Sequence, residues 1–143
     1  TGGIGGTVSG SVLSAVAIRT TLREVLTDDA FPQMIATASR WADGVMGVLT
    51  RHDIPWSVTR LGARAEYHFT PEAPRSGAEA AAAVHHEMER YLHLHALNRG
   101  IIMTPFHNMA LFSPATPRSA ADQHSETLDA AIATLIDGGA LVV

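Results

Sequence analysis

Apolar side chains recur at intervals of three and four between residues 31 and 49, and this spacing is the strongest constraint on how the chain folds. An α-helix with such spacing presents one apolar stripe along one side. Thr27, Asp28 and Asp29 offer capping oxygens just before this run, and Pro32 is tolerated in a first helical turn. The sequence therefore predicts a helix to about Thr50 whose buried side is made of Phe31, Met34, Ile35, Ala38, Trp41, Val45, Val48 and Leu49.

Three further segments show the same helical period. Residues 11–26 predict a helix with one buried stripe, formed by Val12, Ala15, Val16, Ile18, Leu22, Val25 and Leu26. Ser76 and Glu79 have the S-x-x-E spacing of a capping box, which predicts a helix that turns Val84 inward and ends at 98–100. Ser119 and Asp122 are expected to cap a last helix, which Gly138 and Gly139 close.

The remaining apolar runs are short and have the pattern of strands. Residues 56–61 and 64–69 flank Gly62, and the second run alternates polar and apolar side chains, which predicts a half-buried hairpin. Residues 101–103 and 109–112 predict two more strands around a turn. The resulting order is helix, helix, strand, strand, helix, strand, strand, helix. It predicts an α+β fold in which short antiparallel strands are covered by helices.

Composition limits the partners and the chemistry of the chain. With 143 residues, 46% of them hydrophobic, the chain is long enough to bury one core. Its net charge is −4, its arginines are scattered, and no apolar run approaches the roughly 20 residues of a membrane span, so we expect a cytoplasmic protein that binds neither nucleic acid nor membrane. All ten basic residues are arginine, so no reaction that needs a lysine can be completed by this chain alone.

The glycine-rich stretch TGGIGGTVSG lies directly before the first predicted helix. Bare backbone N–H groups at a helix N-terminus can bind an anion such as phosphate. The stretch is not a P-loop, which needs a lysine, and no strand or acidic partner makes it a dinucleotide fingerprint. Anion binding and a simple tight or flexible turn both fit the residues.

Three other groups of side chains have a functional and a structural interpretation. His85, Glu89 and His93 fall on one helical face, where they form either a metal site without the HExxH pattern or a solvated surface. His107 and Asn108 occupy a predicted turn, as substrate contacts or as turn residues. Arg99 either holds a substrate carboxylate or complements the end of a helix.

The segment GGTVSGSVLSAVAIRTTLREV resembles the G-T-x-x-G-N-P-L segment of class III, pyridoxal-phosphate-dependent aminotransferases. RLGARAEYHF resembles the C-terminal hairpin of the branch that includes glutamate-1-semialdehyde aminomutase. RGIIMTPFHNMALFSPATPRSAADQHSETLDAAIATL resembles its pocket strand and closing helix. The resemblance implies the small C-terminal domain of a fold-type-I enzyme over residues 27–143. Residues 1–26 would be the phosphate loop and connecting helix from the large domain.

The resemblance also implies site residues. Gly6 and Thr7 would bind the phosphate of pyridoxal 5′-phosphate in the neighbouring subunit of a homodimer, and Asn108 and Met109 would line the substrate pocket. Ser11 and Val12 replace the family's Asn-Pro, which preserves a helix start but loses the Asn side chain. The Schiff-base lysine of the family would precede residue 1, so no catalytic residue is assigned and the isolated chain is not expected to transaminate.

The implied reaction transfers an amino group from an amino acid or amine to a keto acid or aldehyde. Met109 stands where aminomutases carry a glutamate, and because a thioether hydrogen-bonds an ammonium poorly, we favour a transaminase with an apolar pocket wall. An aminomutase is the alternative within the same class. From another class, a self-standing anion-binding or oligomerisation module without catalysis would also fit a chain without lysine.

Overall fold

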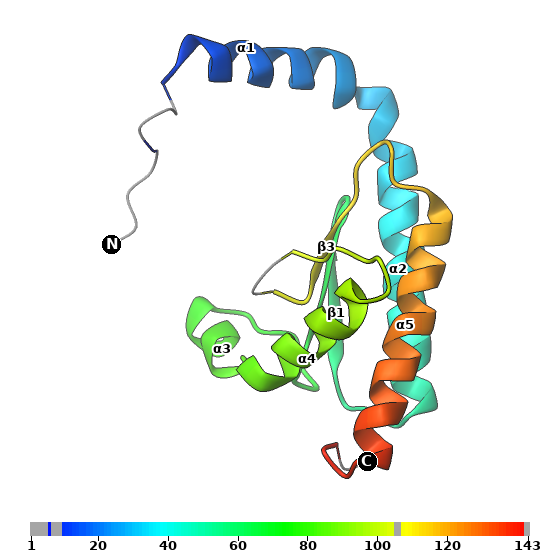
Figure 1. Ribbon diagram of the computed structural model, residues 1–143. Helices are drawn as coiled ribbons and strands as arrows, with labels where there is room; N and C mark the ends of the chain where they lie inside the picture. The colour runs from blue at the N-terminus through cyan, green and yellow to red at the C-terminus, as the bar shows by residue number, and fades with distance from the viewer. Residues whose placement is uncertain (1–5, 7–9, 105–106, 142–143) are drawn as a thin grey trace.

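The computed structural model describes residues 6, 10–104 and 107–141 (Figure 1). The predicted α+β arrangement is confirmed: helices pack on a three-stranded antiparallel sheet. In chain order the elements are α1 (Val12–Thr20), the π-helix η1 (Thr21–Val25), the 3-10 helix η2 (Asp28–Ala30), α2 (Phe31–Arg51), β1 (Ser57–Leu61), β2 (Arg64–His68), α3 (Gly77–Ala82), α4 (His86–Leu97), β3 (Met109–Leu111) and α5 (Arg118–Asp137).

The sheet has the strand order β1-β2-β3. Val58 pairs with Tyr67 across the predicted hairpin, and Ala65 pairs with Ala110 across the second antiparallel pair. Gly62 forms the hairpin turn with a φ of +58°, a conformation that side chains with a Cβ rarely adopt. Ala65 and Tyr67 are buried between more exposed neighbours, so the predicted alternation is confirmed.

The predicted strand at 101–103 is wrong, because these residues complete the end of α4 instead of pairing with a strand. The backbone N–H of Ile101 donates to the carbonyl of Ala96 at 3.0 Å, and Gly100 takes a φ of +79°. Ile102 is 84% exposed, so it has no sheet to pack on among the described residues.

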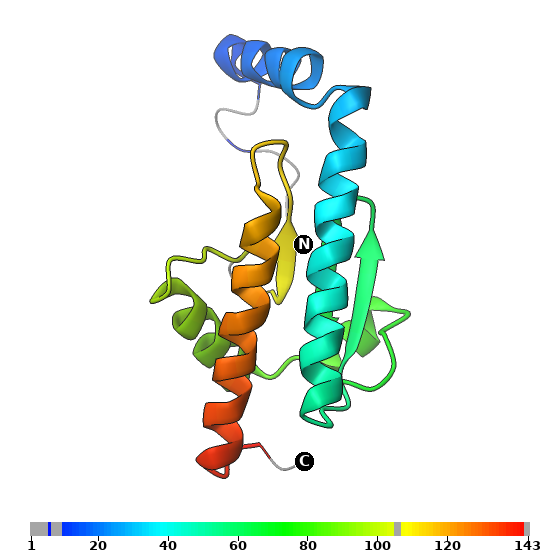
Figure 2. The same ribbon diagram turned by 90° about the vertical axis from the view of Figure 1, so that its right-hand side faces the viewer.

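Two long helices, α2 and α5, lie side by side and carry the core (Figure 2). Helix α2 also packs on β1 and β2, which places the sheet behind the helix pair. The ring of Trp41 in α2 is 2% exposed and contacts Tyr67 at 6.0 Å, Phe112 at 6.4 Å and His124 at 4.9 Å between ring centroids. One side chain therefore joins α2 to the sheet and to α5.

A bidentate ion pair bridges the same two helices at their surface. The guanidinium of Arg40 donates from Nε and an Nη to the two carboxylate oxygens of Asp122 at 2.6 and 3.0 Å. The predicted capping role of Asp122 is thus wrong: α5 begins at Arg118 behind Pro117, without a side-chain cap. Its end is as predicted, with Gly138 as the C-cap and Gly139 at a φ of +68°.

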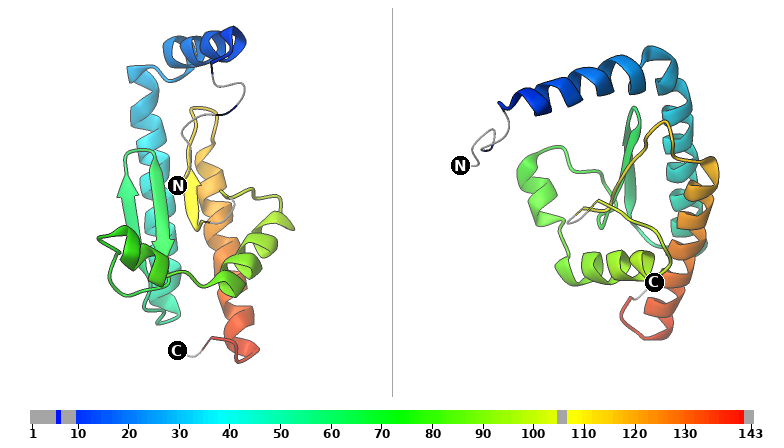
Figure 3. Two further views of the ribbon diagram at one scale, coloured as in Figure 1. Left: turned by 90° about the vertical axis from the view of Figure 1, so that its left-hand side faces the viewer. Right: turned by 45° about the horizontal axis from the view of Figure 1, so that its top comes forward.

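Helix α1 forms where it was predicted but is not buried. Ser11 is its N-cap and its hydroxyl accepts from the backbone N–H of Ser14 at 3.2 Å, so the helix start survives without Asn-Pro. The expected stripe is open to solvent: Val12 is 79% exposed and Ile18 58%. Figure 3 shows α1 extending away from the N-terminal end of α2, where no other described element covers it.

The helix predicted over 76–98 is two helices. Ser76 caps α3 by accepting from the N–H of Glu79, as expected, but α3 ends at Ala82. His85 then caps α4 because its Nδ1 accepts from the N–H of Met88 at 3.2 Å. Val84, expected to face inward, lies in the break and is 41% exposed.

Helix α5 approaches α2 closely at Gly44. A Cβ at this position would collide with the Oγ of Ser125 in α5, whose hydroxyl donates to the carbonyl of Ala121. Overpacking of this kind costs about 1–3 kcal/mol, and the helix propensity of alanine offsets about 1 kcal/mol. We expect Gly44→Ala to lower the free energy of unfolding by up to about 2 kcal/mol in urea denaturation, and Ser125→Gly to restore part of it.

Gly47 in the same helix provides the control, because a Cβ there meets nothing within 4 Å. Gly47→Ala should therefore raise the free energy of unfolding by up to about 1 kcal/mol. Equal effects of the two alanine substitutions would contradict the close approach of α5 to Gly44.

Candidate functional site

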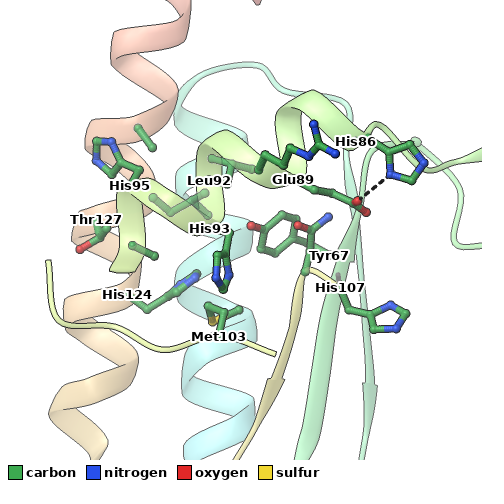
Figure 4. Close-up of a pocket in the computed structure, with 15 residues that line it drawn as sticks. Tyr67, His86, Glu89, Leu92, His93, His95, Met103, His107, His124 and Thr127 are labelled. Atoms are coloured by element: carbon green, nitrogen blue, oxygen red, sulfur yellow. Dashed lines mark ion pairs between the residues drawn. The ribbon is translucent and has the colours of Figure 1, made fainter. Parts of the chain in front are cut away.

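A pocket of about 430 Å³ lies between β2, α4, the segment before β3 and α5 (Figure 4). This volume is in the range of sites that hold small molecules. Leu92 and Ala96 enter from α4, Met103 from the connecting segment, and Leu128 and Ala131 from α5. These apolar side chains share the lining with polar ones, among them five histidines.

Polar groups from three elements reach into this pocket. Figure 4 shows Tyr67 of β2, His93 of α4 and His124 of α5 directed toward its interior. His124 is 4% exposed, and its Nδ1 has no hydrogen-bond partner among the described residues. Burial lowers the pKa of His124 to about 4, so the imidazole is neutral at pH 7. The ring packs on Trp41 of the core, which fixes its position.

Tyr67 connects the pocket to the sheet. Its ring is 4% exposed and stacks between Trp41 and Trp56, with both centroid distances at 6.0 Å. Burial raises the pKa of its phenol well above the ordinary value, and the charge of Glu89 raises it further, so the hydroxyl stays protonated. Its backbone N–H donates to the carbonyl of Asn108 at 3.2 Å.

The charged side chains of the pocket differ in burial. His86 and Arg90 are exposed, whereas the Glu89 side chain is 16% exposed, and its carboxylate lies 3.5 Å from Nδ1 of His86. His95 lies on the α5 side, where burial, with a smaller contribution from Arg99, lowers the pKa of its imidazole. The Nε2 of His95 is buried and has no partner among the described residues.

The predicted site residues occupy two separate places. Asn108 is 9% exposed and lines the pocket, and it also borders a second hollow between the hairpin and α3. Met109 begins β3 opposite Glu66, is half-buried and does not line the pocket. Gly6 is exposed, precedes α1 and does not line the pocket either, while Thr7 lies outside the described residues.

The other candidates have structural roles. His85 caps α4, and the residues that the structure describes contain no group of three or more His, Cys, Asp or Glu side chains that could hold a metal ion. Arg99 donates to the carbonyl of His95 at 3.1 Å and so satisfies the end of α4. Trp41, as expected, and Tyr67 are core residues. In the described part of the chain, no helix has the length and the apolar character that crossing a lipid bilayer requires.

His124 and His95 line the pocket although neither was predicted as a site residue from the sequence. The only available signal was spacing: His124 precedes Leu128 by four residues and therefore shares its inward face. Spacing places a side chain on the inner face of a helix, but it does not show whether the opposing helix fills the space in front of it.

Comparison with known proteins places this fold among pyridoxal-phosphate enzymes. No family model matches the chain. A curated relative, glutamate-1-semialdehyde 2,1-aminomutase 2 of Geobacillus kaustophilus (strain HTA426), is 32% identical over 114 residues, which cover 75% of this chain and 24% of the relative. The chain thus spans about a quarter of that protein.

Solved structures give a closer match. Two crystal structures of a glutamate-1-semialdehyde aminomutase from Pseudomonas aeruginosa PAO1 are 44% identical to the chain, with TM-scores of 0.82 and 0.84. They cover 92% and 93% of this chain and 29% of theirs, and the first is of a variant in complex with PMP. An omega-transaminase from Sphaerobacter thermophilus shares the fold, with a TM-score of 0.69 at 24% identity over 92% of this chain and 30% of its own.

These matches bear out the resemblance seen in the sequence. The chain is similar, over nearly its whole length, to part of the class III, glutamate-1-semialdehyde aminomutase-like branch of pyridoxal-phosphate enzymes. The chain spans 24–29% of these relatives, which is consistent with a C-terminal portion that contains a small domain.

The buried, neutral His124 makes stability depend on pH. Between the ordinary pKa of 6.5 and the folded value of about 4, the unfolded chain binds more protons than the folded one, so acid favours unfolding. We expect the free energy of unfolding to fall by about 2 kcal/mol from pH 7 to pH 5 on account of His124, measured by urea denaturation.

Substitution separates this histidine from the others. His124→Leu should reduce the loss between pH 7 and pH 5, whereas His86→Leu, at an exposed position, should leave it unchanged. An unaltered pH dependence in His124→Leu would show that this imidazole is not the buried titrating group.

Proposed function

We propose that this chain is the C-terminal part of a pyridoxal-phosphate-dependent enzyme that transfers an amino group between a small amino donor and a carbonyl acceptor. Residues 1–26 would complete the large domain, and residues 27–143 would form the small domain. The observation that carries the proposal is the 44% identity to aminomutase structures, with TM-scores of 0.82 and 0.84, over 92% and 93% of the chain.

The residues of this chain do not by themselves fit the cofactor. Pyridoxal phosphate is held through a Schiff base to a lysine, and the chain contains none. The pocket between α4 and α5 presents imidazoles and a carboxylate but no lysine. The reacting groups are therefore proposed to lie in another part of the enzyme, and no reaction step is assigned to this chain.

The proposed contribution of the chain is to bind phosphate through Gly6 and Thr7. The glycines let backbone approach an anion closely, and Thr7 adds a hydroxyl donor a short distance before α1. Ser11 already caps α1 with its own hydroxyl, so the helix does not depend on the preceding loop for its first turn.

A partner subunit is supported by the surface of α1. Val12 is 79% and Leu13 80% exposed, and Leu22 in η1 is 59% exposed. Side chains of this size gain about 1.5–3 kcal/mol each when fully buried, so this apolar surface favours association. We propose a homodimer in which the loop before α1 serves the cofactor site of the neighbouring subunit.

Two reactions are possible for an enzyme of this class: isomerisation, as by an aminomutase, and amino-group transfer between two substrates, as by a transaminase. Identity to the aminomutase structures supports isomerisation of a substrate like glutamate-1-semialdehyde. Met109, at the position where the resemblance expects a glutamate, supports transamination instead. The full-length enzyme should be given glutamate-1-semialdehyde and, separately, an amino donor with a keto acid. Release of a keto product from the donor would establish a transaminase, and isomerisation without it an aminomutase.

A non-catalytic module is the competing proposal, because the chain forms its own core around Trp41. Sequencing the DNA upstream of Thr1 separates the two. An in-frame segment with a lysine after a small residue would support the enzyme, and a start codon immediately before Thr1 would support the module.

The role of Thr7 can be measured in the full-length enzyme. Thr7→Ala should weaken retention of pyridoxal phosphate by about 0.5–1.5 kcal/mol, the net value of one hydrogen bond, in dialysis followed by absorbance. Thr7→Ser keeps the hydroxyl and should retain affinity, and Thr20→Ala in α1 is the control for an exposed threonine. Unchanged affinity in Thr7→Ala would remove Thr7 from the phosphate site.

The absence of lysine gives a test on the chain as it stands. Mixed with pyridoxal phosphate and reduced with borohydride, the chain should be labelled only at its α-amino group, as peptide mass spectrometry would show. A label on any internal peptide would contradict the assignment of the Schiff base to another part of the enzyme.

A further inference from the structure

We propose that the pocket between α4 and α5 binds an ammonium group through the carboxylate of Glu89 and the hydroxyl of Tyr67. The amino donor of the enzyme then carries a second amino group, which does not react. This donor class rests on the proposed function, because Asn108, which was predicted to line the substrate pocket, also lines this pocket. The ammonium site itself can be measured on this chain, so the two parts of the proposal can fail separately.

Glu89 is a mostly buried carboxylate without a permanent cationic partner. Its side chain is 16% exposed, and its ion pair at 3.5 Å is with His86, which is 81% exposed and is a cation only when protonated. Glu66 is similarly buried, at 15%, but the guanidinium of Arg64 lies 2.6 Å from its carboxylate. Buried charges are usually paired, because desolvation of an unpaired charge is unfavourable. A cationic ligand would provide the partner that Glu89 lacks.

The hydroxyl of Tyr67 is a second polar group that a ligand can pair with. The residue is 4% exposed, and Figure 4 shows its side chain directed into the pocket. Its backbone N–H donates to the carbonyl of Asn108, but its hydroxyl makes no hydrogen bond with any described residue. Unlike the Nδ1 of His124, the oxygen of Tyr67 is not fully enclosed, so a ligand in the pocket can contact it.

These polar groups lie at the junction of two hollows. Four side chains line both the pocket and the second hollow between the hairpin and α3, namely Tyr67, Glu89, His107 and Asn108. Burial, and after it the charge of Glu89, raises the pKa of the Tyr67 phenol, so the carboxylate is near enough to act on the hydroxyl. An ammonium group has three N–H donors, one each for the Glu89 carboxylate, the Tyr67 oxygen and the amide oxygen of Asn108.

The remaining side chains place little positive charge inside the pocket. Arg90 is exposed and makes no ion pair with Glu89 in the described part of the chain. Burial lowers the pKa of His124 to about 4 and also lowers the pKa of His95, so both imidazoles are neutral at pH 7. Glu89 thus provides the main charge inside the pocket, which favours a cation as the ligand.

The walls of the pocket favour a methylene chain attached to the ammonium group. Leu92, Met103 and Leu128 line the pocket, whose volume of about 430 Å³ has room for a short chain. Because the Schiff base is assigned to another part of the enzyme, the amino group that reacts is not the one held at Glu89. The donor is therefore a diamine, with two amino groups on a methylene chain.

The ammonium site is tested on this chain with butylamine, which is protonated at pH 7, and with butan-1-ol, a neutral molecule of the same size. In an NMR titration, butylammonium should shift the ring resonances of Tyr67 and the methyl resonance of Met103 in a saturable way. We expect it to bind about 10- to 150-fold more tightly than butanol, the ratio that a net hydrogen bond to a charged group provides. Equal affinities of the two compounds, or shifts that do not saturate, would overturn the proposal.

Substitution identifies the groups that bind the ammonium. Glu89→Gln keeps the size of the side chain and should abolish the preference for butylammonium. Glu87→Gln removes the same charge at an exposed position of α4 outside the pocket and should keep the preference. Tyr67→Phe keeps the ring and should weaken binding by about 2- to 12-fold, the value of one net hydrogen bond. A preference that survives Glu89→Gln, or an unchanged affinity in Tyr67→Phe, would contradict the site.

A measurement on the unsubstituted protein covers the case in which a variant does not fold. Butylammonium should shift the carboxyl carbon resonance of Glu89 and leave that of Glu87 in place, whereas butanol should shift neither. Equal shifts at the two carboxyl groups would mean that the amine binds without regard to the pocket, and the proposal would then be wrong.

The donor class is tested in the full-length enzyme with 1,4-diaminobutane and butylamine as amino donors to a keto acid. We expect kcat/KM to be higher for the diamine by about 10-fold or more, and Glu89→Gln to remove this advantage. Equal values for the two donors would overturn the donor class and leave a transaminase in place. No transfer from any amino donor would overturn transamination and with it the donor class, whereas the titration alone decides the ammonium site.

Discussion

The contact of Trp41 with three separate parts of the chain is the interaction on which the rest of the fold depends. From the middle of α2 its ring reaches Tyr67 in the sheet, Phe112 just after β3 and His124 in α5. The last of these lies more than 80 positions away in sequence, as does the Arg40–Asp122 pair at the surface. Large aromatic side chains dominate the energetics of small cores, so this ring helps to set the register of α5 against α2, together with the Arg40–Asp122 pair and the close approach of Ser125 to Gly44.

That register also creates the pocket. Because α5 is held against α2, its next face, with His124, Thr127, Leu128 and Ala131, is presented to α4. Helix α4 is short and begins only at His86, after the break from α3, so it covers this face without filling the space behind it. The same packing that fixes the core therefore leaves a buried imidazole with one nitrogen that no described residue pairs with.

Local pattern was sufficient for some elements and insufficient for others. Most of the stripe of α2, from Met34 to Leu49, the hairpin around Gly62 and the Ser76 cap could be predicted because each depends on residues close in sequence. Phe31 and Ile35, which were expected in that stripe, are each 41% exposed. The exposure of α1, the break at His85 and the loss of a strand at 101–103 could not, because each depends on whether another element covers or pairs with the segment. In the site, the turn position of Asn108 could be predicted. That no described residue pairs with the Nδ1 of His124 could not, because it depends on how far α4 lies from α5.

Helix α1 has a consequence for the energetics of the chain. Its nine residues include none that is buried, and isolated helices shorter than about 12–15 residues are marginal in water. Its order is thus a local equilibrium, separate from the cooperative unfolding of the body, and its amides should exchange with solvent far sooner than those of α2. A surface that covers α1 must therefore offset the conformational entropy that the helix loses when it becomes ordered. The degree of order in α1 would then report whether that contact has formed.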